Sequence, residues 1–430
     1  MKKIKSWNNY PHTQHNSVIE YDKNIDLSSI KGGSLLVHAL GRSYGDVCLN
    51  ENGNLILTKK LKEIINFDTK AGTIKCEAGL SIKEVLNFIV PFGWFLPVVP
   101  GTRNVTIGGA IANDIHGKNH HNSGSFGNYV RNIKLLRSND DLLHCSDSEN
   151  SDYFKATIGG LGLTGMILEA EIKLKKINSS YIETETQRYD SIDSFWSINK
   201  NYELKNEYTV SWVDCRTNNK GLRGVYHSGN HDKSNNDKIT FGDKSLPFPF
   251  TPPFSLINNL SMRLVNEAYY RINKPISKKK QHYKPFFFPL DLIDNWGRAY
   301  GKNGFLQYQF VVPNEYSVIA LKETLNEIKS YGQIPALGVM KTFGNIKSKG
   351  LLSFPTEGLT LALDFRNKGN TTFNFLNKLD NIVYKYDGSI YPAKDARMSK
   401  NSFNRSFKNI DEFSKYIDPR FSSSFWRRVN

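Results

Sequence analysis

The sequence predicts an α+β protein of two domains, in which the second domain is inserted into the first. Its 430 residues exceed the usual size of a single domain. Strands and short helices over the first 180 residues surround a glycine-rich stretch at 97–128, and from residue 303 strands alternate with amphipathic helices. We therefore expect one domain at 1–180, a second at 181–388, and a return to the first at 389–430.

The first elements lead into a tight turn. Residues 34–40 form an apolar run typical of a buried strand, which continues directly into GRSYGD at 41–46. Gly41 and Gly45 permit positive φ angles and the close approach of a ligand, so this strand and turn indicate phosphate binding. Further short strands are expected at residues 55–57, 64–67 and 73–76.

A helix follows these strands. Ser81 and Glu84 form a capping-box pattern at its start, and Pro91 ends it. Its apolar residues have the i, i+3, i+4, i+7 spacing of a helix that faces the core: Ile82, Val85, Leu86 and Ile89.

The glycine-rich stretch indicates a ligand site. Gly108 and Gly109 remove side-chain bulk, and Thr106 could cap a short helix whose free N–H groups face an anion. A cofactor pyrophosphate would fit there. A glycine-rich surface loop is the alternative, but the density of small residues over so many positions favours a site.

A second glycine motif resembles a nucleotide-binding fingerprint in spacing only. After a predicted hairpin around residues 138–141 and a helical segment at 152–157, the run GGLGLTG contains Gly160, Gly162 and Gly165 in the GxGxxG spacing. A Rossmann fingerprint requires a strand before it and a helix after it. Here a helix precedes and the strand-like MILEAEIKL follows, so a nicotinamide-binding Rossmann fold is excluded.

The second domain begins near residue 179, where aromatic residues and polar loops become frequent. Residues 217–237 are rich in Asn, Gly and Lys and are expected to be irregular and mobile. Residues 244–288 combine prolines and phenylalanines with three consecutive lysines at 278–280. This region could lie on an anionic membrane surface, line the mouth of a pocket for a lipid tail, or pack on its own domain, and these alternatives stay open.

The end of the second domain has a regular pattern. Residues 304–313 alternate like a half-buried strand, which places Gln307 and Gln309 on one face. An amphipathic helix at 317–332, two strands and a second helix at 373–386 complete an α+β cap. From residue 407 the sequence predicts one helix and a tail packed on the first domain.

Composition and charge narrow the function classes. A formal net charge of +16 would attract any polyanion, but the lysines are scattered and accompany no nucleic-acid-binding motif, so we expect no nucleic-acid partner. The four cysteines form no CxxC pair and no metal-like spacing, which predicts free thiols and a reducing compartment. With no recognisable signal peptide or membrane span, we expect a cytoplasmic protein.

Several motifs together resemble one known family. Within the vanillyl-alcohol-oxidase type of FAD proteins, the chain is similar to the flavoenzyme subunits of decaprenyl-phosphoryl-ribose 2′-epimerases. The resemblance implies a two-part FAD-binding domain of the PCMH type and an α+β substrate cap domain with an antiparallel sheet. The matching segments, in order, are GRSYGD (41–46), PGTRNVTIGGAIANDIHGKNHHNSGSFGNYV (100–130), GGLGLTGMI (159–167), GFLQYQFVVP (304–313) and YPAKDAR (391–397).

The resemblance also implies which residues contact FAD. Some relatives bind FAD covalently through a histidine whose place Arg42 takes here, and because arginine cannot form that bond we expect non-covalent FAD. The residues implied for cofactor binding are Gly41, Arg42, Ser43, Tyr44, Gly45, Asp46, Gly101, Thr106, Ile107, Gly108, Gly109, Asn113, Asp114, Ile115, His116, Ile167 and Tyr391.

Oxidation of an alcohol by a flavin needs an acceptor for the hydroxyl proton and positive charge near the reduced ring. We expect Lys394 to orient the substrate and His116 to take a proton or to hydrogen-bond the ring. Gln307, Gln309, Lys341 and Lys394 are expected to bind substrate, with Lys341 in a cationic mouth for a phosphate. His116, His120 and His121 have no nearby carboxylate or thiolate partner in sequence, so no metal is expected.

The function that the resemblance implies is FAD-dependent oxidation of the 2′-hydroxyl of a polyprenyl-phosphoryl ribose. A separate NAD(P)H-dependent short-chain reductase would then complete epimerisation to the arabinose form used in cell-envelope biosynthesis. The alternative within the fold is an oxygen-dependent alditol or sugar-lactone oxidase, and a non-catalytic basic binding protein is a third reading. Peripheral contact with the inner face of the cell membrane stays open. Two departures from the family pattern, Phe286 to Phe288 and Ala362, lie on the substrate side.

Overall fold

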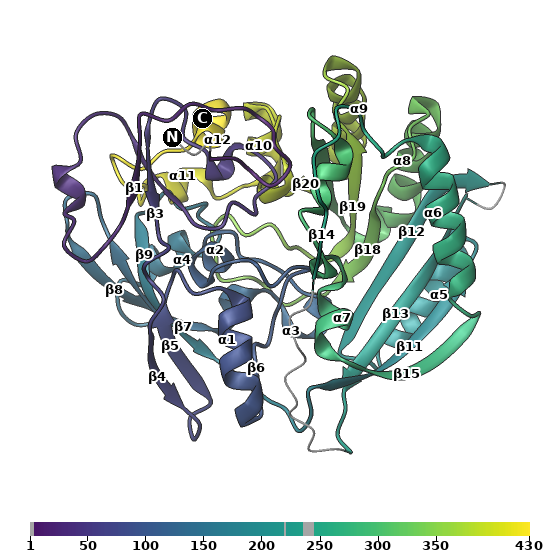
Figure 1. The fold of residues 1–430 in the computed structure, drawn as a ribbon, viewed down its shortest axis with the longest axis horizontal. Helices are drawn as coiled ribbons and strands as arrows, with labels where there is room; N and C mark the ends of the chain where they lie inside the picture. The colour runs from purple at the N-terminus through teal and green to yellow at the C-terminus, as the bar shows by residue number, and fades with distance from the viewer. Residues whose placement is uncertain (1–3, 219–220, 235–244) are drawn as a thin grey trace.

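The computed structural model describes residues 4–218, 221–234 and 245–430. The described chain forms two halves that lie side by side, and both ends of the chain are in the same half (Figure 1). Each half contains a large antiparallel sheet with helices packed against it, so the expected α+β fold is confirmed.

The first half is built on two sheets. A small parallel sheet has the order β1 (Ser17–Glu20), β3 (Asn54–Leu57) and β2 (Leu35–His38). A five-stranded antiparallel sheet has the order β4 (Ile64–Asp68), β5 (Thr73–Glu77), β9 (Met166–Lys173), β7 (Val130–Leu136) and β8 (Leu142–Ser146). β7 and β8 form the predicted hairpin, and β9 follows the GxGxxG run as a strand, which agrees with the exclusion of a Rossmann fingerprint.

The helices of this half are short. The Glu84 N–H donates to the Ser81 hydroxyl at 3.1 Å and the Glu84 carboxylate accepts from the Ser81 N–H at 2.8 Å, so the predicted capping box of α1 (Ile82–Ile89) is confirmed. The predicted apolar face of α1 is fully buried. The remaining elements are β6 (Trp94–Phe95), which pairs with β10 (Lys175–Lys176), and the helices α2 (Ile107–Ala112), α3 (His120–Ser123) and α4 (Ser151–Thr157).

The second half is built on one antiparallel sheet of eight strands. Three helices cover one of its faces and bury the larger apolar core of the molecule: α5 (Ile192–Glu203), α8 (Ser317–Tyr331) and α9 (Asn370–Lys385). The strand order is β15 (Ile276–His282), β11 (Tyr181–Tyr189), β13 (Gly221–His231), β12 (Tyr208–Asn218), β18 (Gly338–Phe343), β19 (Gly358–Arg366), β17 (Phe305–Val312) and β20 (Ser389–Ile390).

Helix α6 (Asn259–Ile272) lies against the other face of this sheet. The Asn266 amide donates to Asp214 of β12 at 2.9 Å, and the ring of Tyr269 is 4.7 Å from that of Trp212. Trp212 and Asp214 point to one face because side chains alternate along a strand, whereas Val213 between them belongs to the core under α5 and α8. The short helix α7 (Tyr283–Phe287) and the pair β14 (Leu246–Pro247) and β16 (Ile293–Asp294) complete this half.

The C-terminal segment leaves the large sheet through β20 and packs on the first half. The Leu35 N–H donates to the Arg420 carbonyl at 2.7 Å, and Arg428 forms an ion pair with Asp46 at 2.6 Å. Three short helices form here instead of the expected single helix and tail: α10 (Lys400–Ser406), α11 (Ile410–Ser414) and α12 (Ser424–Val429). Figure 1 shows them above the glycine-rich α2.

Two other expectations are wrong. Residues 221–231 of the expected mobile segment form strand β13, whose pairing with β11 and β12 satisfies the backbone of a polar sequence; residues 219–220 and 235–237 lie outside the described part of the chain. Strand β17 is buried on both faces instead of one, since the sheet is covered by helices on one side and by the first half on the other.

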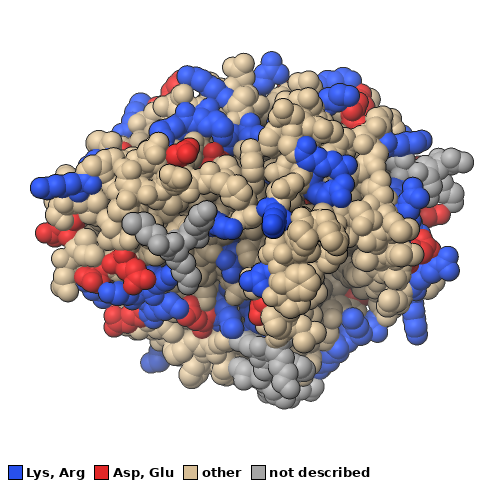
Figure 2. All heavy atoms as spheres, turned by 45° about the horizontal axis from the view of Figure 1, so that its top comes forward, with Lys and Arg blue, Asp and Glu red and all other residues tan. Residues whose placement is uncertain are grey.

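Lysine and arginine side chains are spread over the face that Figure 2 draws, interspersed with aspartate and glutamate. This distribution agrees with the scattered placement of the lysines in the sequence.

Candidate active site

A cavity of about 860 Å³ lies between the two halves, and its walls come from both. The GRSYGD turn and the glycine-rich stretch contribute from the first half, strands β12, β17, β18 and β19 from the second, and the C-terminal return from a third direction. The expected site residues that line this cavity are Gly41, Arg42, Ser43, Tyr44, Gly101, Thr106, Gly108, Gly109, Asn113, Ile115, His116, Ile167, Gln307, Gln309, Lys341, Tyr391 and Lys394.

Four expected cofactor residues do not line the cavity. Gly45 packs so tightly against the C-terminal return that an added Cβ would lie 1.9 Å from a backbone oxygen. Asp46 is paired with Arg428, and Ile107 is fully buried in the apolar core. Asp114 accepts hydrogen bonds from a backbone N–H and two serine hydroxyls. These four residues have structural contacts within the protein instead of a place on the cavity wall.

The anion site expected at the start of α2 does not form. Thr106 caps the helix as predicted, accepting from the Gly109 N–H at 3.1 Å. However, the N–H groups of Ile107 and Gly108 donate to backbone carbonyls of residues 78–80 at 2.8 and 2.9 Å. Because the first N–H groups of α2 are satisfied by the protein, they are not available to a phosphate.

The GRSYGD turn offers the free donors instead. Among the described residues, no acceptor bonds the backbone N–H groups of Gly41, Arg42 or Ser43, and all three residues line the cavity. Gly41 has φ +60°, and a Cβ there would lie 2.9 Å from a carbonyl oxygen, so this conformation requires glycine. Successive free N–H groups at a cavity wall suit an anionic ligand.

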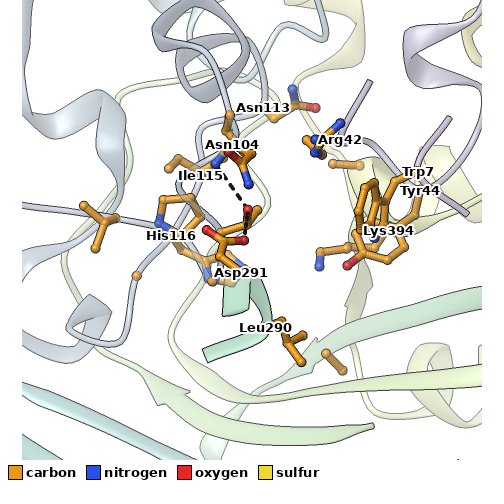
Figure 3. Close-up of a pocket in the computed structure, with 18 of the residues that line it drawn as sticks. Trp7, Arg42, Tyr44, Asn104, Asn113, Ile115, His116, Leu290, Asp291 and Lys394 are labelled. Carbon is orange, nitrogen blue, oxygen red and sulfur yellow. Dashed lines mark hydrogen bonds between the residues drawn. The ribbon is translucent and has the colours of Figure 1, made fainter. Parts of the chain in front are cut away.

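Arg42 is held in the GRSYGD turn by two contacts. Its guanidinium lies over the ring of Trp7, 4.6 Å from the centroid, and donates to the Leu40 carbonyl at 2.5 Å. These contacts fix the arginine at the rim of the turn, where Figure 3 shows it close to Trp7 and Tyr44.

Lys394 lies in an aromatic and acidic environment. Its Nζ is 4.2 Å from the ring centroid of Tyr44. Burial lowers the pKa of Lys394 to about 8, while the charge of Asp364 acts in the opposite direction. Burial likewise raises the pKa of Asp364 to about 6, although the Gln307 amide donates to this carboxylate at 2.5 Å. The second oxygen of Asp364 and the amide oxygen of Gln307 are buried without a partner, so the cluster retains unused hydrogen-bonding capacity.

His116 lies on the other side of the cavity from Lys394 (Figure 3). Its Nε2 is 3.0 Å from the Gln309 amide nitrogen and its Nδ1 is 2.9 Å from Lys341 Nζ. Lys341 therefore lies inside the cavity against His116 and the Gly117 carbonyl, instead of at a mouth that receives phosphate. Burial first, and then the charge of Lys341, lowers the pKa of His116 well below its ordinary value.

Sequence reasoning missed several charged residues of the cavity region, and two of them, Asp364 and Lys118, lie next to expected site residues. Asp364 is an acidic residue in the middle of the apolar strand LTLALDFR, a signal that could have identified it. Lys118 lies two residues after His116, and burial lowers its pKa to about 7. Its Nζ donates to the Phe286 carbonyl and lies 4.9 Å from the ring centroid of Phe286. The departures at Phe286 and Ala362 therefore do belong to the cavity wall.

Residues 21–146 match the family model described as FAD binding domain. The chain is 35% identical over 414 residues to decaprenylphosphoryl-beta-D-ribose oxidase of Mycolicibacterium smegmatis, covering 93% of this chain and 89% of that protein. It is 25% identical over 187 residues to L-gulonolactone oxidase of Mus musculus, covering 42% of each, and 31% identical over 114 residues to Delta(24)-sterol reductase of Rattus norvegicus, covering 26% and 22%.

Proposed function

The chain belongs to the FAD-binding oxidoreductases, in the family of decaprenylphosphoryl-beta-D-ribose oxidase, and from this premise we propose that it oxidises the 2′-hydroxyl of a polyprenyl-phosphoryl ribose to the ketone. The keto sugar would pass to a separate NAD(P)H-dependent reductase, which would complete epimerisation to the arabinose form. The oxygen-dependent lactone oxidase alternative has less support, since similarity to that relative covers 42% of the chain.

The described residues fit FAD. Free N–H groups at 41–43 suit its pyrophosphate, the Asn113 amide oxygen is buried without a partner in the cavity wall, and about 860 Å³ lies within the range of ligand pockets. Bound FAD would accept the carbon-bound hydrogen of the substrate together with its electron pair.

One observation carries the proposal: Lys394, on which the charge of Asp364 acts, and His116, which contacts Lys341, lie on opposite sides of the cavity (Figure 3). An alcohol substrate between them would meet both pairs. Lys394 would hold the reacting oxygen and stabilise the negative charge that develops on it. Gln307 retains an unpaired amide oxygen that can accept a hydrogen bond from a sugar hydroxyl. This chain thus supplies polar groups on both sides of a sugar ring.

Substrate-driven reduction tests the proposed function. We expect the visible flavin band of the purified holoenzyme to bleach without oxygen when polyprenyl-phosphoryl ribose is added. The matching arabinose compound, which is the epimer at the reacting carbon, and a free alditol serve as comparison substrates. Bleaching by the alditol but not by the ribose compound would overturn the assignment. Admitting air afterwards measures whether oxygen reoxidises the flavin.

The outer face of α6 supports a contact with membrane lipid. This helix packs on the sheet through polar groups, since Asn266 bonds Asp214 and Glu267 pairs with Arg223 at 2.7 Å. Met262 is buried, but four apolar residues point to solvent: Leu260 is 69%, Leu264 65%, Val265 56% and Ile272 79% exposed. These four side chains form an apolar stripe on the outer face of α6 that no described residue covers.

Charge and position indicate what the stripe contacts. Residues 259–282 contain six Lys or Arg residues against one acidic residue, Glu267. Ile272 at the end of the stripe and the exposed Ile293 also line the cavity, so the apolar surface continues into the site. We propose that this face rests on an anionic bilayer surface and receives a lipid-linked substrate from it. No described helix has the length and apolar character needed to cross a bilayer.

Vesicle binding tests this contact. Leu264→Glu with Val265→Glu should reduce co-sedimentation with vesicles of phosphatidylglycerol and phosphatidylcholine by about tenfold or more, because charge opposes insertion of the stripe. Ile319→Glu is the control, since Ile319 is an exposed apolar residue on α8. Equal binding of the double variant, or its conversion of a dimer into a monomer without an effect on vesicles, would contradict the lipid contact.

A further inference from the structure

A chain of hydrogen bonds crosses the cavity wall from β19 to β18. The Thr360 hydroxyl lies 2.7 Å from the Phe310 carbonyl oxygen and 3.1 Å from the Gln309 amide nitrogen. The same nitrogen is 3.0 Å from His116 Nε2, and His116 Nδ1 is 2.9 Å from Lys341 Nζ. All these groups except Phe310 have side chains that line the cavity.

The bond from Thr360 to the Phe310 carbonyl determines which group donates in each of the other hydrogen bonds of this series. A carbonyl oxygen can only accept, so Thr360 must give its single hydroxyl hydrogen to Phe310. The Gln309 group that faces Thr360 must then donate, which identifies it as the NH₂ group. Because this NH₂ also faces His116 Nε2, that ring nitrogen carries no hydrogen.

The protonation state of Lys341 follows. A neutral imidazole without hydrogen on Nε2 carries it on Nδ1, where it points at Lys341 Nζ. An ammonium group has no lone pair to accept this hydrogen, whereas an uncharged amine has one. The chain of bonds is therefore complete only when Lys341 is uncharged and donates one of its hydrogens to the Gly117 carbonyl.

The surroundings of Lys341 favour the uncharged form. The charged or titratable groups that act on it or respond to its charge are Lys118, His116, His120 and His121 from the glycine-rich stretch and Lys394 from the C-terminal return. None of them is acidic. Burial, together with the charges of Lys118 and Lys394, lowers the pKa of Lys341 to about 7. Lys394 differs because the charge of Asp364 acts to keep it protonated.

We propose that His116 and Lys341 together accept the hydroxyl proton of the substrate, and that Thr360 and Gln309 are positioning residues that hold this pair ready. The proposal rests on the proposed oxidation. When the substrate hydroxyl replaces the Gln309 NH₂ at His116 Nε2, the O–H bond breaks and an Nε2–H bond forms. The Nδ1–H bond breaks at the same time and Lys341 Nζ gains that hydrogen. One proton thus moves from substrate to Lys341, which becomes an ammonium ion.

The tautomer and the lysine charge can be measured without substrate. In holoenzyme labelled at histidine and lysine, NMR should show His116 protonated at Nδ1 and bare at Nε2, and should show Lys341 titrating near pH 7. Thr360→Val removes the hydroxyl that orients the Gln309 amide. The amide oxygen of Gln309 can then face His116 and accept from a hydrogen on Nε2. In that tautomer Nδ1 is bare and can accept from Lys341, so Lys341 can stay charged. The Lys341 midpoint should therefore rise by about one pH unit or more. Thr360→Ser should restore the original midpoint.

A matched control exists in the same sheet. Thr184 donates to the Lys279 carbonyl at 2.9 Å and accepts from the Gln281 amide at 3.3 Å, the same arrangement without a histidine. Thr184→Val should leave the Lys341 midpoint unchanged. A Lys341 that stays an ammonium ion up to pH 9 in the wild-type holoenzyme would overturn the proposal.

The rate of substrate-driven bleaching gives the functional readout. Lys341 is active when uncharged, so the rate should rise with pH and level off above about pH 7. In Thr360→Val the rise should move to higher pH, with a roughly tenfold loss at pH 6.5 that is recovered above pH 8.5. A loss by the same factor at every pH would assign Thr360 a structural role only. Because the NMR measurement needs no substrate, a wrong choice of sugar and a wrong proton acceptor give different results.

Discussion

Lys394→Ala should retain bound FAD but lose substrate-driven bleaching by about two to three orders of magnitude, the usual effect of removing a group that stabilises developing charge. Lys394 lies against the Tyr44 ring within the cavity, and the charge of the buried Asp364 acts on it. The alanine variant removes the cation whose charge lowers the pKa of this buried carboxylate, so the Asp364 pKa should rise when activity is lost. Flavin content and the anaerobic rate of bleaching are the measurements.

Two variants separate the chemical role of Lys394 from its effect on folding. Lys394→Arg keeps the positive charge but alters its geometry, and we expect partial activity. Lys400→Ala removes an exposed lysine six residues further along the chain and should have no effect. An unchanged rate of bleaching in Lys394→Ala would exclude this lysine from the mechanism.

Gly109→Val should give protein that contains little FAD, with an expected loss of flavin content of about tenfold or more. Gly109 lines the cavity, and a Cβ there would lie 3.1 Å from the Thr106 hydroxyl with no other atom closer than 3.8 Å. The backbone can therefore accept a small side chain, whereas the two methyl groups of valine would occupy space in the cavity wall. The ratio of visible to ultraviolet absorbance measures flavin content.

Gly109→Ala is the control for this prediction. It adds the Cβ beside Thr106 but no methyl group beyond it, so it tests whether disturbance of the α2 cap alone releases the cofactor. We expect it to keep most of its FAD. Equal loss in the two variants would attribute the effect to the cap, and full flavin content in Gly109→Val would remove Gly109 from the cofactor site.

The sequence predicted most elements of the site because its signals are local. Ser81 and Glu84 determine a capping box within four residues, and the order of helix, glycines and strand around Gly162 excludes a Rossmann fingerprint without any tertiary information. Gln307 and Gln309 share a face because strand alternation alone places them there.

Other expectations were wrong where a residue has its bonding partner in a distant segment of the chain. The free N–H groups of α2 looked available, but residues 78–80 supply carbonyl acceptors for them. Asp46 belonged to a motif that resembles a cofactor-binding segment, yet Arg428, far along the chain, pairs with it. In both cases the partner is determined by packing between elements, which no local pattern encodes.

The sequence by itself determined the α+β class, because hydrophobic periodicity is a property of the chain, and its motifs in their order carried the resemblance to an FAD-binding family. Only the tertiary structure decided how the charges of the site are arranged. Burial lowers the pKa of Lys341, Asp364 acts on Lys394, and Thr360 orients Gln309 and His116. The physical reason is that pKa values and hydrogen-bond directions depend on desolvation and on groups that folding brings together from five separate segments.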